Sequence, residues 1–514
     1  MSPNEPETPS IDLMKEIVSL AKQRGFVFQS SEIYGGLKSA YDYGPLGAEL
    51  KRNIMNEWWR SMVYEREDVV GMDASIIMHS KVWEASGHLA GFSDPLVDCR
   101  NCKERFRGDK APRAQPGSTV TSVEGGRRGS KTLTGTVDPR GYVCPNCGSS
   151  DLSAERNFNL MFRTNLGPVD VVQDVVDAIH GKDLSKEEMR AAIDAKVRET
   201  AVYLRPETAQ AMFVQFLNVQ QSMSMKIPFG IAQMGKSFRN EVTVEHFIFR
   251  SCEFEQMEME FFVEPGTQKK WLDYWKEERM SWYRRFVNSP EKLRLRRHED
   301  NERAHYADDC YDVEYEYPWG WGELEGIASR TDYDLSKHSK HSGSHINILD
   351  PNRPDPTTGK PPYRFTPYVI EPAAGATRAT LMFLLDAFRI EDKPRPNAKG
   401  EVETRRVLKL HPRLAPYKAA ILPLVKKDGM PELGRKIVRQ FLDAGINVRF
   451  DEQHSIGKRY ARHDEIGTPY CITVDGDSVK DGVVTIRDRD TTEQVKVKID
   501  EAFAVVKERV FGHR

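Results

Sequence analysis

The sequence predicts an α+β protein with two or three domains, and three observations support this fold class. At 514 residues, the chain exceeds the usual size of one domain. Polar and apolar residues alternate from Phe247 to Val263, which favours antiparallel strands with one face lining a site. From Ala419 onward, strands and helices alternate over about 100 residues, which is typical of a small α/β domain.

Two amphipathic helices are expected near the N-terminus. Apolar residues recur at helical spacing from Ile11 to Gln23 and again from Ala48 to Val63. One side of the second helix suits either a dimer interface or the chain's own core, and the sequence leaves both open. That side consists of Leu50, Ile54, Trp58 and Met62. Val69 to Met78 is then expected to form a strand.

Later elements follow from the same periodicities. Residues 168–200 and Trp271–Phe286 are expected to be helical, and Asp350–Pro362 is expected to be a loop. Prolines and a glycine mark a boundary between Arg395 and Pro416. Beyond it, the predicted elements are a strand at Ala419–Leu424, a helix at Glu432–Ala444, a strand at Asn447–Phe450, a helix near Tyr460, strands at Tyr470–Val474, Val483–Arg487 and Glu493–Lys498, and a helix at Asp500–Val510.

Composition and charge limit the possible partners. The chain has 75 Lys and Arg against 77 Asp and Glu, so charge alone predicts no attraction to nucleic acid or to a membrane surface. No apolar run reaches the length of about 18 residues expected of a transmembrane helix. The polar segment Met1–Pro9 lacks the basic start and apolar stretch of a signal peptide. We therefore expect a cytoplasmic protein with no membrane or DNA partner.

Four of the seven cysteines form two Cys-x-x-Cys pairs, namely Cys99 with Cys102 and Cys144 with Cys147. Four thiolates are enough for a tetrahedral zinc site, and the filled coordination favours a structural role. The Gly/Ser/Arg-rich stretch from Gly117 to Gly141 would be a loop of this zinc-ribbon-like unit. Two surface disulfides, or two knuckles without metal, are the alternatives. The remaining cysteines are expected to be ordinary buried thiols: Cys252, Cys310 and Cys471.

Three arginines, Arg239, Arg250 and Arg378, lie in strand-rich segments. Guanidinium groups bind phosphate oxygens bidentately and keep their charge. The chain has no P-loop motif and no Gly-x-Gly-x-x-Gly in a βαβ unit, so a triphosphate would be bound by another geometry. Carboxylates near the same segments would balance charge, recognise an amine or hold Mg²⁺, and they are Glu207, Glu258 and Glu371. Each residue alone suits an ordinary salt bridge, but together they favour a site for a polyphosphate and an ammonium group.

These segments resemble the motifs of the class II aminoacyl-tRNA synthetases, most closely those of the homodimeric glycyl-tRNA synthetases. Their order and spacing carry the resemblance, which covers nearly the whole chain. The matching segments are Tyr41–Gly47, Val82–His88, Phe238–Glu241, Arg294–Arg296 with His305–Ala307, Gly320–Ala328 with Arg330–Leu335, and Glu371–Arg378.

The resemblance implies a catalytic domain on a mainly antiparallel sheet with flanking helices, formed by residues 10–98 and 152–395. The cysteine pairs would form a zinc-ribbon-like insertion at residues 99–151. The resemblance also implies an anticodon-binding α/β domain at residues 413–514, and a homodimer whose interface includes the first motif. The implied reaction joins glycine to its tRNA through a glycyl-adenylate made from ATP with Mg²⁺.

The resemblance also implies residues that bind ATP. Arg239 would hold the α-phosphate and the glycine carboxylate, Arg378 would hold the γ-phosphate, and both would act in catalysis. Glu241 would meet the adenine amino group, and Phe254 would stack on the ring. Arg250 would extend the phosphate clamp, and Glu323 would help to place Mg²⁺. The other implied members are Asn240, Phe249, Leu324 and Gly375.

Glycine has no side chain to recognise, so a tight anionic pocket is expected. The resemblance implies that Glu207, Glu258 and Glu371 hold the ammonium group and leave no room for a methyl. The other residues that the resemblance implies for glycine binding are Arg107, Phe254, Ala373 and Gly375. Ala373 stands where the family usually has Ser, and Cys252 stands where it commonly has Arg. Both departures are expected to shift the KM for glycine without abolishing activity.

RNA contact is less visible in the sequence. Lys458, Arg459, Arg462 and His463 form a basic cluster that suits either phosphate contact or a solvated helix face, and only the resemblance favours the former. Two other functions remain open. One is a catalytically inactive, synthetase-like RNA-binding or regulatory protein, against which the intact Arg239, Glu241 and Arg378 argue. The other is an adenylating enzyme for another small amino acid.

Overall fold

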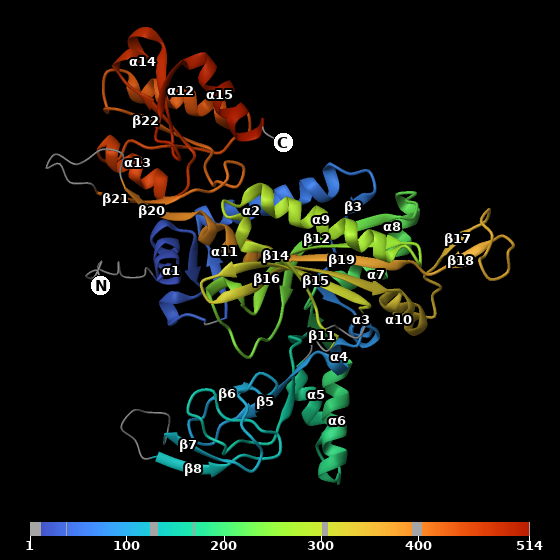
Figure 1. Cartoon of the computed structure of the whole chain (residues 1–514). Helices are drawn as coiled ribbons and strands as arrows, with labels where there is room; N and C mark the ends of the chain where they lie inside the picture. Colours follow the sequence, from blue (N-terminus) through green and yellow to red (C-terminus); the bar gives the residue numbers. More distant parts are fainter. Residues whose placement is uncertain are drawn as a thin grey trace, which may run out of the picture.

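A seven-stranded sheet forms the centre of the molecule (Figure 1). The computed structural model describes residues 12–37, 39–123, 132–167, 170–300, 307–392 and 403–512. The strand order is β14-β15-β16-β19-β13-β12-β3, and every neighbouring pair is antiparallel except β12 with β3. The predicted α+β class and mainly antiparallel sheet are therefore confirmed. The strands are β3 (Val69–Gly71), β12 (Phe229–Phe238), β13 (Glu253–Val263), β14 (Leu293–Arg297), β15 (Asp309–Tyr317), β16 (Gly320–Thr331) and β19 (Tyr368–Gly375).

Three helices pack on this sheet and build the main core with it: α2 (Pro45–Trp59), α9 (Gln268–Phe286) and α11 (Ala376–Ala387). The apolar side of α2 and its π-helical extension η2 (Arg60–Tyr64) is buried within the chain, with Leu50, Ile54 and Trp58 at 0% exposure. The core interpretation of that side is thus confirmed. Gly47 permits the close packing, because a Cβ there would lie 1.8 Å from the carbonyl oxygen of Phe26. The predicted first helix is α1 (Leu13–Arg24).

Strand β13 separates the core from the opposite face of the sheet by simple alternation. Met257, Met259 and Phe261 point into the helical core, whereas Phe254 and Glu258 belong to the other face. The predicted strand begins later than Phe247, because Phe247–Phe249 forms a 3₁₀ turn (η4). His246 and Phe247 have positive φ values of 55° and 59°, which end any extended conformation there.

The opposite face carries a second core cluster under α7 (Ala209–Val214), α8 (Phe216–Ser222) and α10 (Tyr333–Ser342). The predicted strand Val69–Met78 is wrong in its middle. The amide of Ala74 donates to the side chain of Gln233 at 2.7 Å, so the ladder with β12 ends, and β4 (Ile77–Met78) joins a different sheet. The remaining elements of this part of the molecule are β1 (Val27–Gln29), η1 (Glu32–Tyr34), β2 (Tyr41–Tyr43), α3 (Ser80–Ala85), α4 (His88–Gly91), β10 (Arg163–Asn165), β11 (Ala201–Leu204), η5 (Pro290–Lys292), β17 (Ile348–Asp350) and β18 (Tyr363–Phe365), and β1 and β2 pack with the main core.

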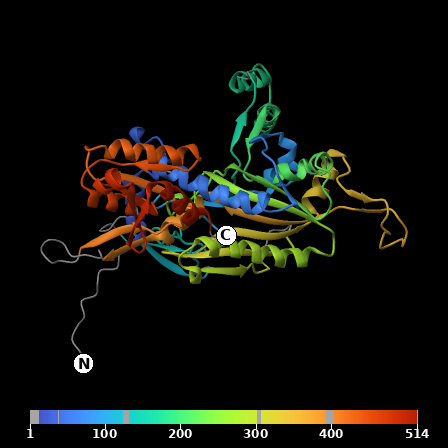
Figure 2. The ribbon, with the colours of Figure 1, turned by 90° about the horizontal axis from the view of Figure 1, so that it is seen from above.

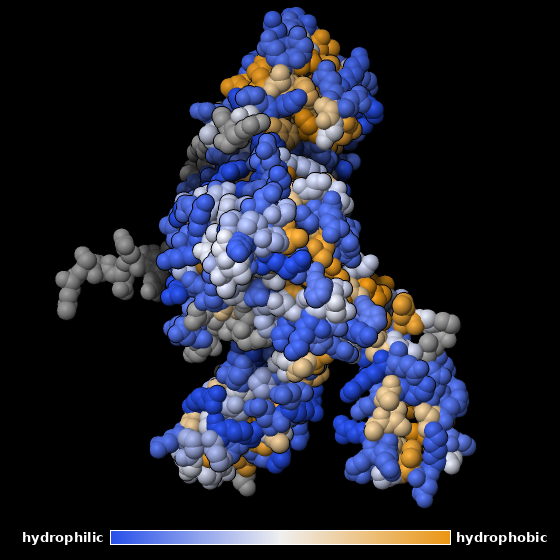
Figure 3. Space-filling model, turned by 90° about the vertical axis from the view of Figure 1, so that its right-hand side faces the viewer, coloured by the Kyte–Doolittle hydropathy of each residue, from blue (hydrophilic) through white to orange (hydrophobic). Residues whose placement is uncertain are grey.

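Two lobes project from the body on the side away from the C-terminal domain (Figures 1 and 3). One is the cysteine module, with the sheet β6-β5-β9 and the hairpin β7-β8. Its strands are β5 (Ser93–Asp98), β6 (Arg105–Arg107), β7 (Thr119–Val123), β8 (Thr132–Thr136) and β9 (Arg156–Asn159). The other lobe is a helical hairpin, α5 (Val171–Ile179) and α6 (Lys186–Glu199), as predicted for residues 168–200. Its exposed valines form an apolar strip in Figure 3, with Val172 at 74% exposure.

The C-terminal domain lies beside α1 and α2, and Figure 2 shows it from above. Its sheet has the order β23-β22-β24-β25-β26, with β22 parallel to both of its neighbours. The sequence predicted the other elements to within two residues and a helix near Tyr460, where α13 lies, but it missed α14. The elements are β22 (Ala419–Pro423), α12 (Met430–Asp443), β23 (Val448–Phe450), α13 (Ile456–Glu465), β24 (Tyr470–Val474), α14 (Gly476–Asp481), β25 (Val483–Asp488), β26 (Gln494–Lys498) and α15 (Ile499–Phe511).

A two-stranded hairpin, β20 (Phe388–Asp392) and β21 (Thr404–Leu408), connects the two domains. The predicted boundary at Arg395–Pro416 begins in the segment between these strands. Met1–Pro9, Ile11, His305–Tyr306 and residues 395–402 lie outside the described residues. Within the described part of the chain, no helix combines the length and apolar character needed to cross a membrane.

Candidate active site

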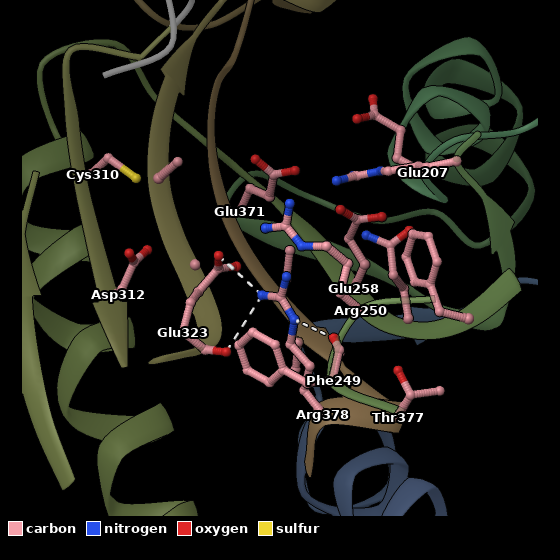
Figure 4. Close-up of a pocket in the computed structure, with 18 of the residues that line it drawn as sticks. Glu207, Phe249, Arg250, Glu258, Cys310, Asp312, Glu323, Glu371, Thr377 and Arg378 are labelled. Atoms are coloured by element: carbon pink, nitrogen blue, oxygen red, sulfur yellow. Dashed lines mark hydrogen bonds and ion pairs between the residues drawn. The ribbon is translucent and has the colours of Figure 1, made fainter. Parts of the chain in front are cut away.

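A cavity of about 300 Å³ opens on the face of the central sheet that alternate residues of β13 leave outside the helical core (Figure 4). This volume lies at the lower end of the range for small-molecule sites. Its walls come mainly from β13, β15, β16, β19 and the start of α11. Most of the predicted site residues line it: Glu207, Arg239, Glu241, Phe249, Arg250, Phe254, Glu258, Glu323, Glu371, Ala373, Gly375 and Arg378.

Three predicted residues are not part of the cavity lining. Leu324 is fully buried in the helical core, because it alternates with Glu323 along β16 and so faces the other way. Asn240 donates its backbone amide to the carbonyl of Leu160 at 2.8 Å, and its side chain does not reach the cavity wall. Arg107 belongs to β6 of the cysteine module and pairs with Asp94 and Asp109 at 2.8 and 2.7 Å.

One end of the cavity is dominated by Arg378, at the first turn of α11. Its Nη1 lies 3.0 Å from Glu323 Oε2, and its guanidinium lies 4.7 Å from the centre of the Phe249 ring (Figure 4). The charge of Arg378 lowers the pKa of Glu323, so that carboxyl group is ionised. Arg250 extends the positive end and lies 3.7 Å from Glu241. This end combines cationic groups with an aromatic surface.

Arg239 lines the same cavity, and its charge, after that of Arg378, lowers the pKa of Glu323. Its Nε donates to the carbonyl of Pro206 at 3.0 Å. Its guanidinium lies 5.4 Å from the ring centres of both Phe92 and Phe254, which flank it. These contacts fix the plane of the guanidinium while its terminal nitrogens remain available to a ligand.

The other end of the cavity is acidic and holds Glu207, Glu258 and Glu371. Glu371 accepts two hydrogen bonds from Arg330 Nη1, at 2.9 and 2.8 Å. Glu258 accepts hydrogen bonds from the amide of Thr208, at 3.0 Å, and from its hydroxyl. Burial, followed by the charges of Glu371 and Glu207, raises the pKa of Glu258 well above its usual value. A cation entering here would relieve this repulsion.

Glu207 differs from Glu258 and Glu371 in the direction of its pKa shift, which is downward rather than upward. Burial alone would raise its pKa, but His88 and Arg330 hold the pKa of Glu207 below its usual value. His88 Nε2 lies 3.4 Å from one carboxylate oxygen, and Gln210 Nε2 donates to the other at 2.9 Å. Glu207 is therefore a carboxylate of fixed orientation at the cavity wall.

Arg330 is a buried residue of this site to which the sequence reasoning gave no role. Its Nε and Nη2 bind both oxygens of Asp334, at 2.8 and 3.0 Å, while its Nη1 binds Glu371. The side chain is 3% exposed. Its position within the matching segment Arg330–Leu335 was the available signal, but the sequence does not show which partners a buried arginine will take.

The sequence reasoning also missed His298, Cys310 and Asp312 as residues of the cavity lining. His298 Nε2 lies 2.7 Å from Asp312 Oδ2. Burial, and then the charge of Glu323, raises the pKa of Asp312 to about 6. Cys310 was predicted to be an ordinary buried thiol, but it lines the cavity. Burial raises the pKa of its thiol to about 12. Glu323, with Asp312 nearby, offers the oxygen ligands that a divalent cation prefers.

The four cysteines of the two Cys-x-x-Cys pairs meet in the cysteine module. The sulfur of Cys99 lies 3.7 Å from that of Cys147, and Cys102 lies 3.6 Å from Cys144. All four sulfurs lie within 4.8 Å of one another, and none is in a disulfide. Tetrahedral zinc with bonds of about 2.3 Å would separate its sulfur ligands by about 3.8 Å, so the donor set fits zinc. Among the alternatives, the two surface disulfides are wrong.

The basic cluster predicted in the C-terminal domain is wrong in two of its members. Arg459 is 2% exposed and donates to the carbonyl of Pro423 at 2.7 Å, so it braces the domain's own backbone. His463 is 1% exposed and contacts Thr468 and Asp451. Of the four predicted members, Lys458 is exposed and Arg462 is partly exposed.

Comparison with known proteins matches two domain families. Residues 193–387 match the tRNA synthetase class II core domain (G, H, P, S and T), and residues 418–509 match an anticodon binding domain. The chain is 45% identical to glycine–tRNA ligase of Treponema denticola over 502 residues, covering 98% of both chains. It is 47% identical to glycine–tRNA ligase of Geobacillus thermodenitrificans over 500 residues, with 97% of both chains covered. With glycine–tRNA ligase of Clostridium perfringens it shares 46% identity over 496 residues, or 96% of this chain and 97% of the relative.

Proposed function

The chain belongs to the glycine–tRNA ligase family, and we propose that its cavity forms glycyl-adenylate from glycine and ATP before glycine passes to tRNA. The observation that carries this proposal is the polarity of the cavity. Arg378 stands at one end and the carboxylates of Glu207, Glu258 and Glu371 at the other, and Arg250 and Arg239 also line the cavity. Such an arrangement suits a triphosphate at one end and an amino acid whose ammonium group lies at the other.

In the first step, an oxygen of the glycine carboxylate attacks the α-phosphorus of ATP. The bond from the α-phosphorus to the bridging oxygen breaks, and pyrophosphate leaves with the bond's electrons. The carboxylate is already a nucleophile, so the enzyme's main contribution is in-line positioning and charge neutralisation. Arg239 would contact both the glycine carboxylate and the α-phosphate, because it is bonded to Pro206 beside Glu207 and its charge, after that of Arg378, lowers the pKa of Glu323.

At the ATP end, Arg378 and Arg250 would bind the outer phosphates, and Glu241 would meet the adenine amino group. Phe249 is better placed than Phe254 to stack on the adenine ring, because it lies against Arg378 whereas Phe254 lies against Arg239. Gly375 would let the ligand approach the backbone. Mg²⁺ bound with ATP would neutralise phosphate charge, and Glu323 would hold it, since that carboxyl group is ionised and lines the cavity.

At the acidic end, Glu207, Glu258 and Glu371 would bind the ammonium group of glycine. Ala373 pairs with Glu258 across β13 and β19, so its methyl group stands where a serine would offer a hydroxyl. Arg330 donates hydrogen bonds to Glu371, and these bonds do not involve residue 373. Arg107 would act only from outside the cavity lining, through its charge on Glu241.

In the second step, a terminal ribose hydroxyl of the tRNA attacks the glycyl carbonyl, and AMP leaves. The C-terminal domain, residues 413–514, would bind the anticodon. Residues 10–98 and 152–395 would form the catalytic domain, and residues 99–151 would form an insertion held by zinc. The sheet of this insertion also includes β9, which lies beyond residue 151.

We further propose that the enzyme acts as a homodimer in the cytoplasm, where its tRNA substrate would be charged. Because the apolar side of α2 is filled by the chain's own core, the dimer surface would lie elsewhere in the N-terminal region. Ile33 and Tyr34 are 89% and 87% exposed, and Tyr64 is also exposed, which supplies apolar surface for such a contact.

Pyrophosphate exchange into ATP, measured with each standard amino acid, tests the proposed function. We expect exchange with glycine alone, followed by glycine transfer when tRNA is added. Exchange with alanine or serine but not glycine would instead identify an adenylating enzyme for another amino acid. A protein that binds tRNA but supports no exchange would be a catalytically inactive RNA-binding relative.

A further inference from the structure

His88 lies against Glu207, at the acidic end of the cavity, and the proposed reaction assigns it no role. It is the first residue of α4, and it is not part of the cavity lining. Its side chain is 12% exposed, and its Nε2 lies 3.4 Å from Oε2 of Glu207. The imidazole therefore contacts an acid that we propose binds the ammonium group, without lining the cavity itself.

Contacts with several residues hold the ring of His88 in place. Its Nδ1 lies 2.8 Å from the hydroxyl oxygen of Ser86, a residue with 8% exposure. The ring meets that of Trp83 edge-on, with centres 5.5 Å apart, and its centre lies 5.4 Å from that of Phe92. The backbone is held as well, because Asn159 Nδ2 donates to the carbonyl of His88 at 3.2 Å. The imidazole therefore presents Nε2 to Glu207 in a defined direction.

The two partners of the imidazole place a hydrogen on the nitrogen that faces Glu207. An ionised carboxylate only accepts hydrogen bonds, so a bare Nε2 would set one lone pair against another. When the imidazole is neutral with its hydrogen on Nε2, Nδ1 accepts from the Ser86 hydroxyl. When the imidazole is charged, Nδ1 donates to Ser86, whose hydroxyl then donates to the carbonyl of Trp83 at 3.4 Å. In both forms Nε2–H is directed at the carboxylate.

The other oxygen of Glu207 is held by Gln210 of α7. Gln210 Nε2 donates to Glu207 Oε1 at 2.9 Å and to Asp334 Oδ1 at 3.0 Å. The side-chain oxygen of Gln210 lies 2.8 Å from His338 Nε2, so its amide group has partners at both ends. Gln210 is also fully buried. Donors from two separate segments, α4 and α7, thus fix the plane of one carboxylate, and loss of either would free one of its oxygens.

The charges around Glu207 show why it needs such donors. Glu258 and Glu371 line the same end of the cavity, and burial raises the pKa of both, while the charge of Glu207 raises them further. Arg330 acts on Glu207 through its charge and donates hydrogen bonds to Glu371 and Asp334. Because neighbouring acids repel one another, an unrestrained Glu207 carboxylate would turn away from the other two when no ammonium group is bound.

We propose that His88 is a positioning residue of the amino-acid pocket, whose Nε2–H donates to Glu207 and holds that carboxylate ready for the ammonium group of glycine. His88 does not touch the substrate, and it acts through Glu207. Phe92, which packs on the imidazole, also lies 5.4 Å from the guanidinium of Arg239, so one short segment contacts two residues proposed to bind glycine. The inference rests on the proposed function, because it assumes that this end of the cavity binds glycine.

The test compares two substitutions of His88 in glycine-dependent pyrophosphate exchange, with KM measured for glycine and for ATP. H88Q offers an amide N–H in place of Nε2–H, so we expect its KM for glycine to stay within about threefold of the original. H88F keeps an aromatic ring between Trp83 and Phe92 but has no donor, and we expect its KM for glycine to rise about tenfold or more while its KM for ATP changes little. H345F, at an exposed histidine outside the cavity lining, is the matched control and should leave both constants unchanged.

Three kinetic outcomes overturn the proposal. If H88F binds glycine normally, His88 positions nothing. If H88Q raises the KM for glycine as much as H88F does, the donor role is rejected. If H88F raises both KM values equally, His88 supports the whole cavity wall rather than Glu207. Should the variants not fold, a neutron crystal structure of the unsubstituted protein decides, because a deuteron on Nε2 directed at Glu207 supports the proposal and a bare Nε2 refutes it. Absence of glycine-dependent exchange in the unsubstituted protein would reject the proposed function, a result separate from the neutron result.

Discussion

At the scale of single residues, Arg239 is the side chain that we propose contacts both glycine and ATP. We predict that Arg239→Ala lowers the rate of glycine-dependent pyrophosphate exchange about a hundredfold or more, because it removes the guanidinium that we propose contacts the α-phosphate. The fold should survive, since only its Nε is tied to the backbone. Circular dichroism checks the fold. Arg439→Ala, a change at an exposed residue of the C-terminal domain, is the control. Near-normal exchange in Arg239→Ala would contradict the assigned role.

Asp312 gives a prediction about pH. Burial and the charge of Glu323 raise its pKa to about 6, so its carboxylate charge is present above that pH and is lost as the pH falls through it. If Asp312 helps to attract Mg²⁺ with ATP, the KM for ATP should rise as the pH falls through about 6. Asp312→Asn should have a raised KM that no longer changes over this range. Glu316→Gln, at an exposed position on the same strand, should keep the original profile, and an unchanged profile in Asp312→Asn would exclude the role.

Residues of the cavity were predictable where they belong to a motif and were missed where only the sheet register brings them in. Glu323 was identified, but so was Leu324, although strand alternation alone would have turned Leu324 into the core. His298 and Asp312 reach the cavity because β14 and β15 pair beside β16, and the sequence does not reveal that pairing.

At the scale of secondary structure, local periodicity succeeded where helices and strands alternate regularly, as from β22 to α15. It failed in two predicted strands, for two different reasons. The predicted strand Val69–Met78 is interrupted because Gln233 takes the amide of Ala74. The predicted strand at Phe247 is instead a turn, because His246 and Phe247 adopt a left-handed conformation. Neither event has a local sequence signal, since non-glycine residues rarely adopt positive φ.

The cysteine module is an element whose stability we predict to depend on metal. Its small core consists largely of the cysteines themselves with Val97, Phe106 and Leu152. Metal analysis should find about one zinc per chain, and Cys144→Ser should lose the metal and make the module sensitive to limited proteolysis. Cys252→Ser, outside the cluster, should retain the metal. Full activity and proteolytic resistance without metal would rule out a structural zinc.

At the scale of the whole molecule, the catalytic sheet and the C-terminal domain are joined by buried charges as well as by the chain. Arg405 of β21 donates a hydrogen bond to Asp464 of α13 at 2.8 Å. Asp464 also accepts hydrogen bonds from both terminal nitrogens of Arg487 in its own domain, at 2.8 and 3.0 Å. At the same boundary, Arg24 pairs with Glu465 and Arg413 pairs with Glu57. The C-terminal domain is therefore held in a defined position relative to the cavity, as binding one tRNA at two distant points would require.

This arrangement predicts that the two steps of the reaction can be separated. Asp464→Asn leaves two buried guanidinium groups facing an amide, so the junction should lose about 3 kcal/mol or more of stability. Transfer of glycine to tRNA should fall because the C-terminal domain is no longer held in place. Pyrophosphate exchange should persist, since every residue lining the cavity belongs to the catalytic sheet and its surroundings. Asp443→Asn, at an exposed ion pair of the same domain, should change neither activity. A parallel fall of exchange and transfer in Asp464→Asn would instead mean that the junction supports the cavity itself.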